Sequence, residues 1–493
     1  MPLLPLLVLA AADPEVPARW RDAAAVVEQG LARRVFPGAV VVVGRGDSVL
    51  FAHGFGRLDW SRTSSRPDPE TTQFDLASLT KVVATASSAM TLVADGRLDI
   101  EAPVQRYLPA FAGAGKERVT VRMLLEHTSG LPAFVAFYRT TSSRDAVLAA
   151  LLDVPLRRTP GTSVEYSDLN GMLMGQVIEA ITGTRLDRYA DRAVFRPLGM
   201  VHTTFAVADR THAAPSLVRN GRPAPGVASD PNARAMGGIA GHAGLFASGL
   251  DLGRFAQAWM HGGPAGRSNQ WVDDATVARF RETRLGKAGR ALGWDVPKLD
   301  ALAESPFGTL ATPTTLGHTG WSGTFLWLDP ARDLFLVFLT NRSLGQSNSA
   351  SLRQCATFAI ASRTPFAGPP VSRRGRVDRR LRRGIGSGGS RRKDTVVTPE
   401  IVRKALQAVK DPELGLNIVD IGLVYDIAVS EANDVHIKMT LTSPGCPSGP
   451  EMLEDTRLVA EQVEGVNNAE VELVWEPYWT PERMDPRVRA FLG

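Results

Sequence analysis

The stretch FDLASLTKVVATASSAMTLV, from Phe74 to Val93, places Ser78 three residues ahead of Lys81 within one helical pattern. Residues three apart lie on the same face of a helix, so the Lys81 amine can reach the Ser78 oxygen. We expect Ser78 in the first helical turn, where unpaired backbone N–H groups and the helix dipole favour an alkoxide. The spacing therefore predicts a serine nucleophile beside its activator.

An isolated Ser-x-x-Lys is common, but two further segments follow it in order. A Tyr-Ser-Asp box at residues 166–168 precedes a helical pattern, and a Gly-His-Thr-Gly-Trp run begins at Gly317. These boxes resemble the S-x-x-K, Y-x-N and K-T-G boxes of the serine penicillin-recognising enzymes. The segments VTVRMLLEHTSGLP, from Val119, and NARAMGGIAGHAGLFAS, from Asn232, match as well. From about residue 20 to 365 the chain resembles the class C β-lactamase, esterase and D,D-peptidase branch of that superfamily.

The resemblance assigns a role to each box. Ser78 would attack the substrate, and Lys81 and Tyr166 would share its proton. We expect burial to lower the pKa of Lys81 and the amine to push Tyr166 toward phenolate, and which of the two is the base stays open. The backbone N–H groups of Ser78 and Trp321 would form the oxyanion hole. The implied catalytic residues are Ser78, Lys81, Tyr166 and His318, and the implied oxyanion and substrate-binding residues are Ser78, Asp168, Thr319, Gly320 and Trp321.

Two positions depart from the usual boxes. Asp168 stands where the middle box often has Asn, and His318 stands where the third often has Lys. A histidine is mostly neutral at pH 7, so it would pair poorly with the carboxylate of a penicillin. We therefore expect a serine hydrolase that forms an acyl-enzyme with an ester or a small peptide amide, with weak or no β-lactamase activity and no cofactor. The alternative is a catalytically silent module that binds a ligand in the same cleft.

Several of these residues also have plainer structural explanations. Asp168 could cap the helix that follows it, Tyr166 could be a buried aromatic residue, and His318 could pack its ring against a strand. We expect His127 to be structural. We leave His242 outside the catalytic set, because it could simply fill a tight glycine turn.

The element pattern and the resemblance together predict the fold. Residues 22–33 form an amphipathic helical pattern, and residues 38–56 and 323–342 each form a β-hairpin pattern. The resemblance implies an α/β (α+β) fold in which an antiparallel sheet is flanked by helices and a helical subdomain carries Tyr166.

The length of 493 residues suggests two or three domains. We divide the chain into a signal-like leader at 1–17, the hydrolase domain at 18–365, an Arg/Gly/Ser-rich linker at 366–397 and a C-terminal domain at 398–493. The net charge is +5, and within it residues 372–393 carry +9 while the C-terminal domain carries −9, so that these two segments cancel. The basic stretch is therefore local and does not indicate a nucleic-acid partner.

The C-terminal domain carries its own resemblance. DPELGLNIVDIGLVYDIAV, from Asp411, and MTLTSPGCPSGPEM, from Met439, resemble the small domain of SufT-like iron–sulfur assembly proteins. This implies iron–sulfur assembly proteins as partners, and Cys446, on a turn ahead of a helix, is the candidate metal ligand. One cysteine cannot supply the four ligands that a cluster usually takes, so a protein–protein adaptor is the alternative.

Several features of the sequence bear on the compartment in which the protein works. The chain has two cysteines, Cys355 and Cys446, which gives no sign of an oxidising compartment. The first twelve residues resemble the core of a secretory signal but lack a positive n-region. No run of apolar residues is long enough to predict a membrane span. We expect the cytoplasm, where iron–sulfur assembly occurs, with a periplasmic or secreted location as the alternative.

Overall fold

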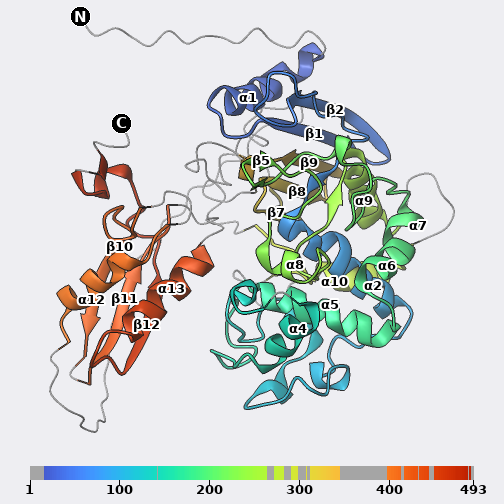
Figure 1. The fold of residues 1–493 in the computed structure, drawn as a ribbon. Coiled ribbons are helices and arrows are strands. Elements are labelled where there is room, and N and C mark those ends of the chain that lie inside the picture. Colours follow the sequence, from blue (N-terminus) through green and yellow to red (C-terminus); the bar gives the residue numbers. More distant parts are fainter. Residues whose placement is uncertain are drawn as a thin grey trace, which may run out of the picture. The chain divides into compact units, whose positions relative to one another are not determined.

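The computed structural model describes residues 16–141, 143–263, 271–282, 290–297, 307, 311–344, 397–411, 416–430, 432–442, 449–486 and 488–489. The chain divides into two compact units, Met1–Ser362 and Arg363–Gly493 (Figure 1). Each unit is described by itself. Residues 1–15 of the expected leader, residues 366–396 of the expected linker and Cys446 lie outside the described residues.

The larger unit is built on a five-stranded antiparallel sheet with the strand order β2-β1-β9-β8-β7. The strands are β1 Gly38–Arg45, β2 Ser48–Gly56, β7 Leu316–Gly320, β8 Thr324–Asp329 and β9 Leu334–Thr340. Both expected hairpins are present, and β1 pairs with β9 so that the two ends of the unit share one sheet (Figure 1). The expected antiparallel sheet flanked by helices is confirmed.

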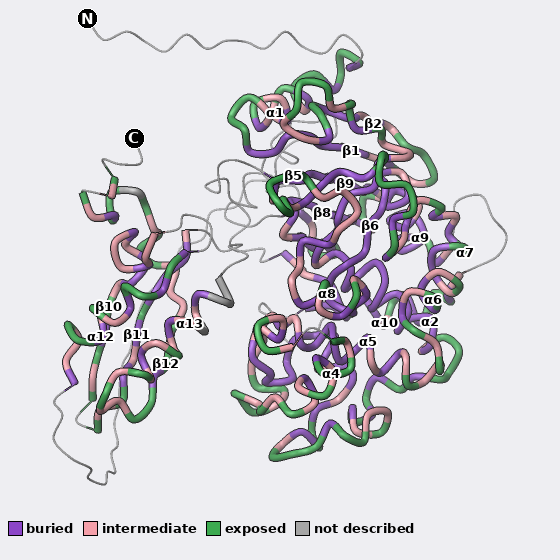
Figure 2. The backbone as a smooth tube through the Cα atoms, in the orientation of Figure 1, coloured by how far each residue is buried: buried purple, intermediate pink, exposed green. Residues whose placement is uncertain are grey.

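The sheet is covered by helices because its strands are apolar on both faces. Every residue of β8 and β9 is buried, as the purple strands in Figure 2 show. Helix α9, Gly249–His261, packs on β1, β8 and β9, and α1, Arg21–Ala32, packs on β2. Burial of such apolar surface is the main stabilising contribution to the unit.

The segment that carries Ser78 and Lys81 is a composite helix. It begins with a 3₁₀ turn at Ala77–Leu79, continues as a π-helix at Lys81–Ala86 and ends as α2, Ser87–Ala94. Ser78 therefore lies in a 3₁₀ turn rather than in the first turn of one regular α-helix. By length and composition alone Ala77–Ala94 could cross a membrane, but 83% of it is buried, as in the core helix of a soluble protein.

The helical region between the two hairpins carries the middle box at the start of α5, Asp168–Thr182. The other helices and strands of this unit are α3 Val121–Leu125, α4 Arg144–Asp153, α6 Leu186–Ala190, α7 Arg196–Leu198, α8 Pro231–Ala235, α10 Asp274–Arg281, β3 Phe74–Asp75, β4 Val218–Arg219, β5 Arg222–Pro223 and β6 Phe246–Ala247.

The smaller unit has a three-stranded sheet, β10 Val424–Val429, β11 Asp434–Met439 and β12 Asn468–Leu473, together with α12 Pro399–Ala405 and α13 Gly449–Glu461. Strand β11 is antiparallel to β10 and parallel to β12. Thr398 caps helix α12, because its hydroxyl accepts a hydrogen bond from the Ile401 N–H at 3.4 Å. This compact sheet unit agrees with the expected small C-terminal α/β domain.

The end of β7 lies directly against the nucleophile turn. A Cβ at Gly320 would collide with the Thr324 hydroxyl and with the main-chain oxygen of Leu76. The main-chain oxygens of Asp75 and Leu76 accept hydrogen bonds from the Ser322 hydroxyl at 2.5 Å and the Thr324 hydroxyl at 3.1 Å. The missing side chain at Gly320 therefore lets the third box approach the residues just before Ser78.

We expect Gly320→Ala to separate β7 from the nucleophile turn and to slow reaction of Ser78 with a fluorophosphonate by about 100-fold, the effect of a displacement of roughly 1 Å. Labelling kinetics followed by mass spectrometry measure this. The matched control is Gly253→Ala in α9, where a new Cβ would lie at an ordinary 3.5 Å from the Phe335 ring. The control should label at the wild-type rate, and equal slowing in both variants would contradict the explanation.

Candidate active site

The three boxes meet at one place in the larger unit. Ser78 and Lys81 come from the composite helix, Tyr166 precedes α5, Asp168 is the first residue of α5, and His318 lies on β7. The Lys81 ammonium donates hydrogen bonds to Ser78 Oγ at 3.0 Å and to Asp168 Oδ1 at 2.7 Å. The ring centroids of Tyr166 and His318 are 5.9 Å apart. The fold therefore brings the sequence-predicted catalytic side chains together.

Lys81 is buried, with 4% of its side chain exposed. Its third hydrogen-bond acceptor is the main-chain oxygen of His242, at 3.1 Å. Burial alone would lower the pKa of the Lys81 amine, but the Asp168 carboxylate and the Tyr166 hydroxyl oppose this effect, and the pKa is raised. The expected lowering is wrong because Asp168 forms an ion pair with this amine, a contact that the spacing of the boxes does not reveal.

Tyr166 is held in its neutral form. Its hydroxyl is buried and has no hydrogen-bond partner within bonding distance among the described residues, although Lys81 and Ser78 lie near enough to affect it. Burial raises the pKa of the phenol, and the opposing effects of Lys81 and Ser78 do not reverse this shift. The expected push toward phenolate is therefore wrong, since the Lys81 charge is already compensated by Asp168.

The ring of His127 packs against the ring of Tyr166. The two rings are stacked with centroids 4.6 Å apart, and His127 Nδ1 accepts a hydrogen bond from the Ser167 N–H at 3.0 Å. Burial, together with the charges of Arg290 and Lys81, holds the pKa of His127 well below its usual value. A neutral imidazole is required at this place, because the Ser167 N–H needs an acceptor.

His318 is a buried, neutral residue of the third box. Its Nδ1–H donates to the main-chain oxygen of Thr319 at 2.8 Å. Burial is the main cause that lowers the pKa of His318 to about 4, and the nearby charges of Arg290 and Lys81 act in the same direction. This agrees with the expectation that the third box carries no permanent charge at this position.

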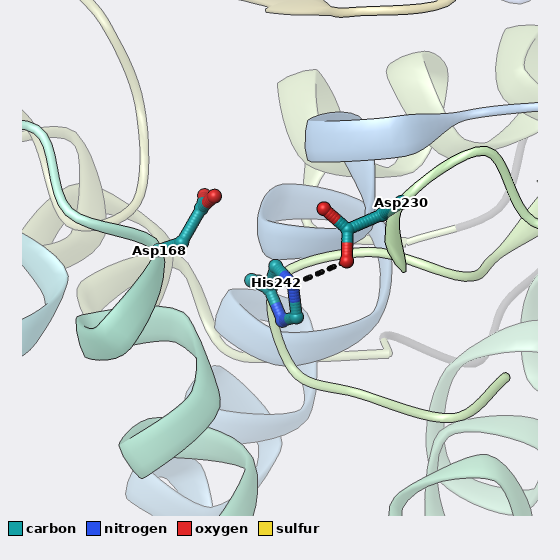
Figure 3. Close-up of side chains that lie close together, drawn as sticks. All are labelled: Asp168, Asp230 and His242. Carbon is teal, nitrogen blue, oxygen red and sulfur yellow. Dashed lines mark hydrogen bonds and ion pairs between the residues drawn. The ribbon is translucent and has the colours of Figure 1, made fainter. Parts of the chain in front are cut away.

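Asp168 does not cap α5. The N-cap residue is Ser167, and the Asp168 carboxylate turns to Lys81 instead. A ligand atom of Asp168 lies within 4.8 Å of ligand atoms of Asp230 and His242, which themselves pair at 2.9 Å (Figure 3). The His242 side chain, which the sequence left unassigned, thus lies in a charged cluster next to Lys81. The Lys81 ammonium, paired with Asp168 at 2.7 Å, is a cation that already lies beside this cluster.

A functional group that the sequence did not predict is the guanidinium of Arg290. Arg290 is 8% exposed, forms an ion pair with Asp295 and lies with its guanidinium carbon 5.5 Å from the Tyr166 ring centroid. Its Nε and Nη2 atoms are buried and have no hydrogen-bond partner within the described part of the chain. Arg290 belongs to none of the three boxes, so no sequence signal marked it.

We expect the rate of Ser78 labelling to fall on the acidic side of its pH profile, and Asp168→Asn to move this acidic limb toward lower pH by about 1 to 3 pH units. The pKa of Lys81 is raised in the wild type, so its amine is protonated below that value and Ser78 lacks a base there. Without the carboxylate, burial is left to lower the pKa of the amine. Fluorophosphonate labelling rates from pH 5 to 10 measure the limb.

The matched control for this change lies on the same helix. Glu179→Gln removes a carboxylate that pairs with Arg144 at 2.7 Å, away from Lys81. Its pH profile should equal that of the wild type. A limb that stays in place in Asp168→Asn would contradict the role given to the ion pair.

Comparison with known proteins first concerns the smaller unit. Residues 399–473 match the family described as "Iron-sulfur cluster assembly protein". Among the residues of this unit that the structure describes, no three His, Cys, Asp or Glu side chains come together as metal ligands. The described residues therefore give no support for a resident metal, and Cys446 lies outside them.

The larger unit matches the family described as "Beta-lactamase" over residues 23–354. A relative from Salmonella paratyphi B, named "Putative D-alanyl-D-alanine carboxypeptidase", is 32% identical over 343 residues, which cover 62% of this chain and 79% of the relative. A penicillin-binding protein homolog from Caulobacter crescentus has a similar fold, with a TM-score of 0.56, 22% identity and coverage of 72% of this chain and all of that one. So does EstCE1, "a hydrolase with promiscuous acyltransferase activity", with a TM-score of 0.55, 23% identity and coverage of 69% and 98%. The chain belongs to the β-lactamase family of serine hydrolases and carries an iron–sulfur assembly domain at its C-terminal end.

Proposed function

We propose that the larger unit hydrolyses an ester or a small peptide amide through an acyl-enzyme on Ser78. The observation that carries this proposal is the hydrogen bond from the buried Lys81 ammonium to Ser78 Oγ at 3.0 Å. A serine becomes a nucleophile when a neighbouring group accepts its proton, and Lys81 is the neighbour in contact.

The ion pair suggests how that proton moves. Lys81 is an ammonium in the resting site, so it must lose a proton before it can accept one from Ser78. Asp168, at 2.7 Å, is the acceptor in contact with it. Tyr166, a neutral phenol at rest, would protonate the leaving group and regain a proton from Lys81, which has received the proton of Ser78. The N–H groups of Ser78 and Trp321 would stabilise the oxyanion, where each donor contributes about 2.7 to 4 kcal/mol to lowering the barrier.

The position and charge of Arg290 favour a substrate that carries a carboxylate close to the scissile bond. Two of its nitrogens are buried near Tyr166 and have no hydrogen-bond partner in the described ranges of the chain, and a planar guanidinium binds a carboxylate through paired hydrogen bonds. The neutral His318 cannot supply that charge. A short peptide with a free C-terminal carboxylate is therefore our first choice, in keeping with the name of the Salmonella relative. A neutral ester is the second.

A first experiment separates the enzyme from a silent ligand-binding module. We expect the intact mass of the full-length chain to rise by one adduct after incubation with a fluorophosphonate, and Ser78→Ala to remain unlabelled. We expect little or no stable adduct with a penicillin. A wild-type protein that takes up neither reagent would favour the binding module.

A second experiment tests the substrate class. We expect Arg290→Gln to lower kcat/KM about 10- to 100-fold for a peptide with a free C-terminal carboxylate, the effect of losing a charged hydrogen bond. The amidated peptide and a neutral p-nitrophenyl ester should change little. Arg254→Gln, which removes an arginine paired with Glu70 and Asp251, is the matched control. Equal losses for all three substrates would contradict carboxylate recognition.

For the smaller unit we propose a role as an adaptor to iron–sulfur assembly proteins, with Cys446 as the candidate contact to metal. We also propose the cytoplasm as the compartment, since such assembly belongs to a reducing environment. A spectrum of anaerobically purified chain, with and without Cys446→Ala, tests the metal contact. Fractionation of cells with detection of the intact chain tests the location.

A further inference from the structure

Asp75 is a buried carboxylate that the catalytic scheme does not use. It ends β3, three residues before Ser78, and is 2% exposed. One carboxylate oxygen accepts a hydrogen bond from the Ala77 N–H at 2.9 Å. The other accepts the Ser229 N–H at 2.6 Å and the Ser216 hydroxyl at 2.9 Å. One side chain thus joins the nucleophile turn to two distant segments.

The turn that Asp75 holds has an unusual conformation. Ala77 has a φ of +46°, a left-handed conformation that residues with a Cβ rarely adopt. Such a residue is strained, and it persists only where the surrounding structure fixes it. The Asp75 carboxylate accepts a hydrogen bond from the N–H of this residue and therefore contacts its backbone directly.

The main chain of Asp75 makes a second connection. Its carbonyl oxygen accepts the Ser322 hydroxyl at 2.5 Å, next to Trp321, and the following Leu76 carbonyl accepts the Thr324 hydroxyl. Ser229 lies beside Asp230, which pairs with His242. Asp75 therefore touches the nucleophile turn, the strand of the third box and the loop next to Lys81.

We propose that Asp75 is a positioning residue that sets the direction of Ser78 by holding Ala77 in its left-handed conformation. The proposal rests on the proposed acyl-enzyme function. An aspartate suits this place because the Ala77 N–H, the Ser229 N–H and the Ser216 hydroxyl are all donors, and a carboxyl group offers them acceptors at both oxygens. An asparagine of the same shape would turn one donor toward other donors.

The test compares labelling rates of Ser78 in four chains, namely wild type, Asp75→Asn, Ala77→Gly and the double variant. We expect Asp75→Asn to slow fluorophosphonate labelling and to lower kcat for a p-nitrophenyl ester by roughly 10- to 100-fold, with little change in KM. Glycine adopts a positive φ without strain, so Ala77→Gly should react normally. In the double variant it should restore most of the lost rate.

Recovery in the double variant distinguishes positioning from a general loss of stability, which glycine at residue 77 would not restore. The matched control is Asp251→Asn, which alters another buried aspartate, one that accepts hydrogen bonds from His202, Thr203 and Arg254. Asp251→Asn should lower the melting temperature without slowing the labelling of Ser78 in the folded protein.

Three outcomes would overturn the proposal. They are normal labelling by Asp75→Asn, absence of recovery in the double variant, and equal slowing in Asp251→Asn. If Asp75→Asn does not fold, Ser216→Ala takes its place. This variant removes one of the donors that fix the carboxylate, and labelling at the wild-type rate would then refute the proposal. Failure of the wild type itself to label refutes the acyl-enzyme function instead, so the two failures can be told apart.

Discussion

The buried ion pair between Lys81 and Asp168 is the interaction on which the charge of the catalytic amine depends. Taking an ammonium ion out of water costs several kcal/mol, and the structure offsets this cost with three acceptors, one of which is a carboxylate at 2.7 Å. Lys81 remains charged because its neighbours Asp168 and Tyr166 together outweigh the effect of burial on its pKa, whereas burial keeps Tyr166 a neutral phenol. The chemistry that follows differs from a site in which an amide stands in place of Asp168, because the first proton must leave an ammonium.

Around this pair the fold holds segments that are far apart in the sequence. The 3₁₀ turn with Ser78, the start of α5 and the end of β7 come from three regions of the chain, and short hydrogen bonds from Ser322 and Thr324 join the last to the first. The close contact at Gly320 and the left-handed Ala77 are both backbone features. The geometry of the nucleophile therefore depends on backbone conformation at residues that take no part in the chemistry.

A positively charged side chain lies in the site, but it does not belong to the third box. The third box has a neutral His318, while the buried Arg290, on a separate segment near Tyr166, has two nitrogens without a hydrogen-bond partner among the residues that the structure describes. A guanidinium can bind a carboxylate at two points, whereas a lysine ammonium acts as a single point charge. A change at one box position thus need not remove carboxylate recognition, since another part of the fold can supply the cation.

The sequence by itself determined the family, the two hairpins that close the sheet and the composition of the three boxes. These depend on local spacing and on the intrinsic chemistry of single side chains, both of which are readable without coordinates. The charge of Lys81, the neutral state of Tyr166 and the positions of Arg290, His242 and Asp75 were decided only by the tertiary structure. A pKa depends on burial and on the nearest charges. Here those neighbours lie far apart in the sequence, between residues 75 and 318, and only the folded chain brings them into contact.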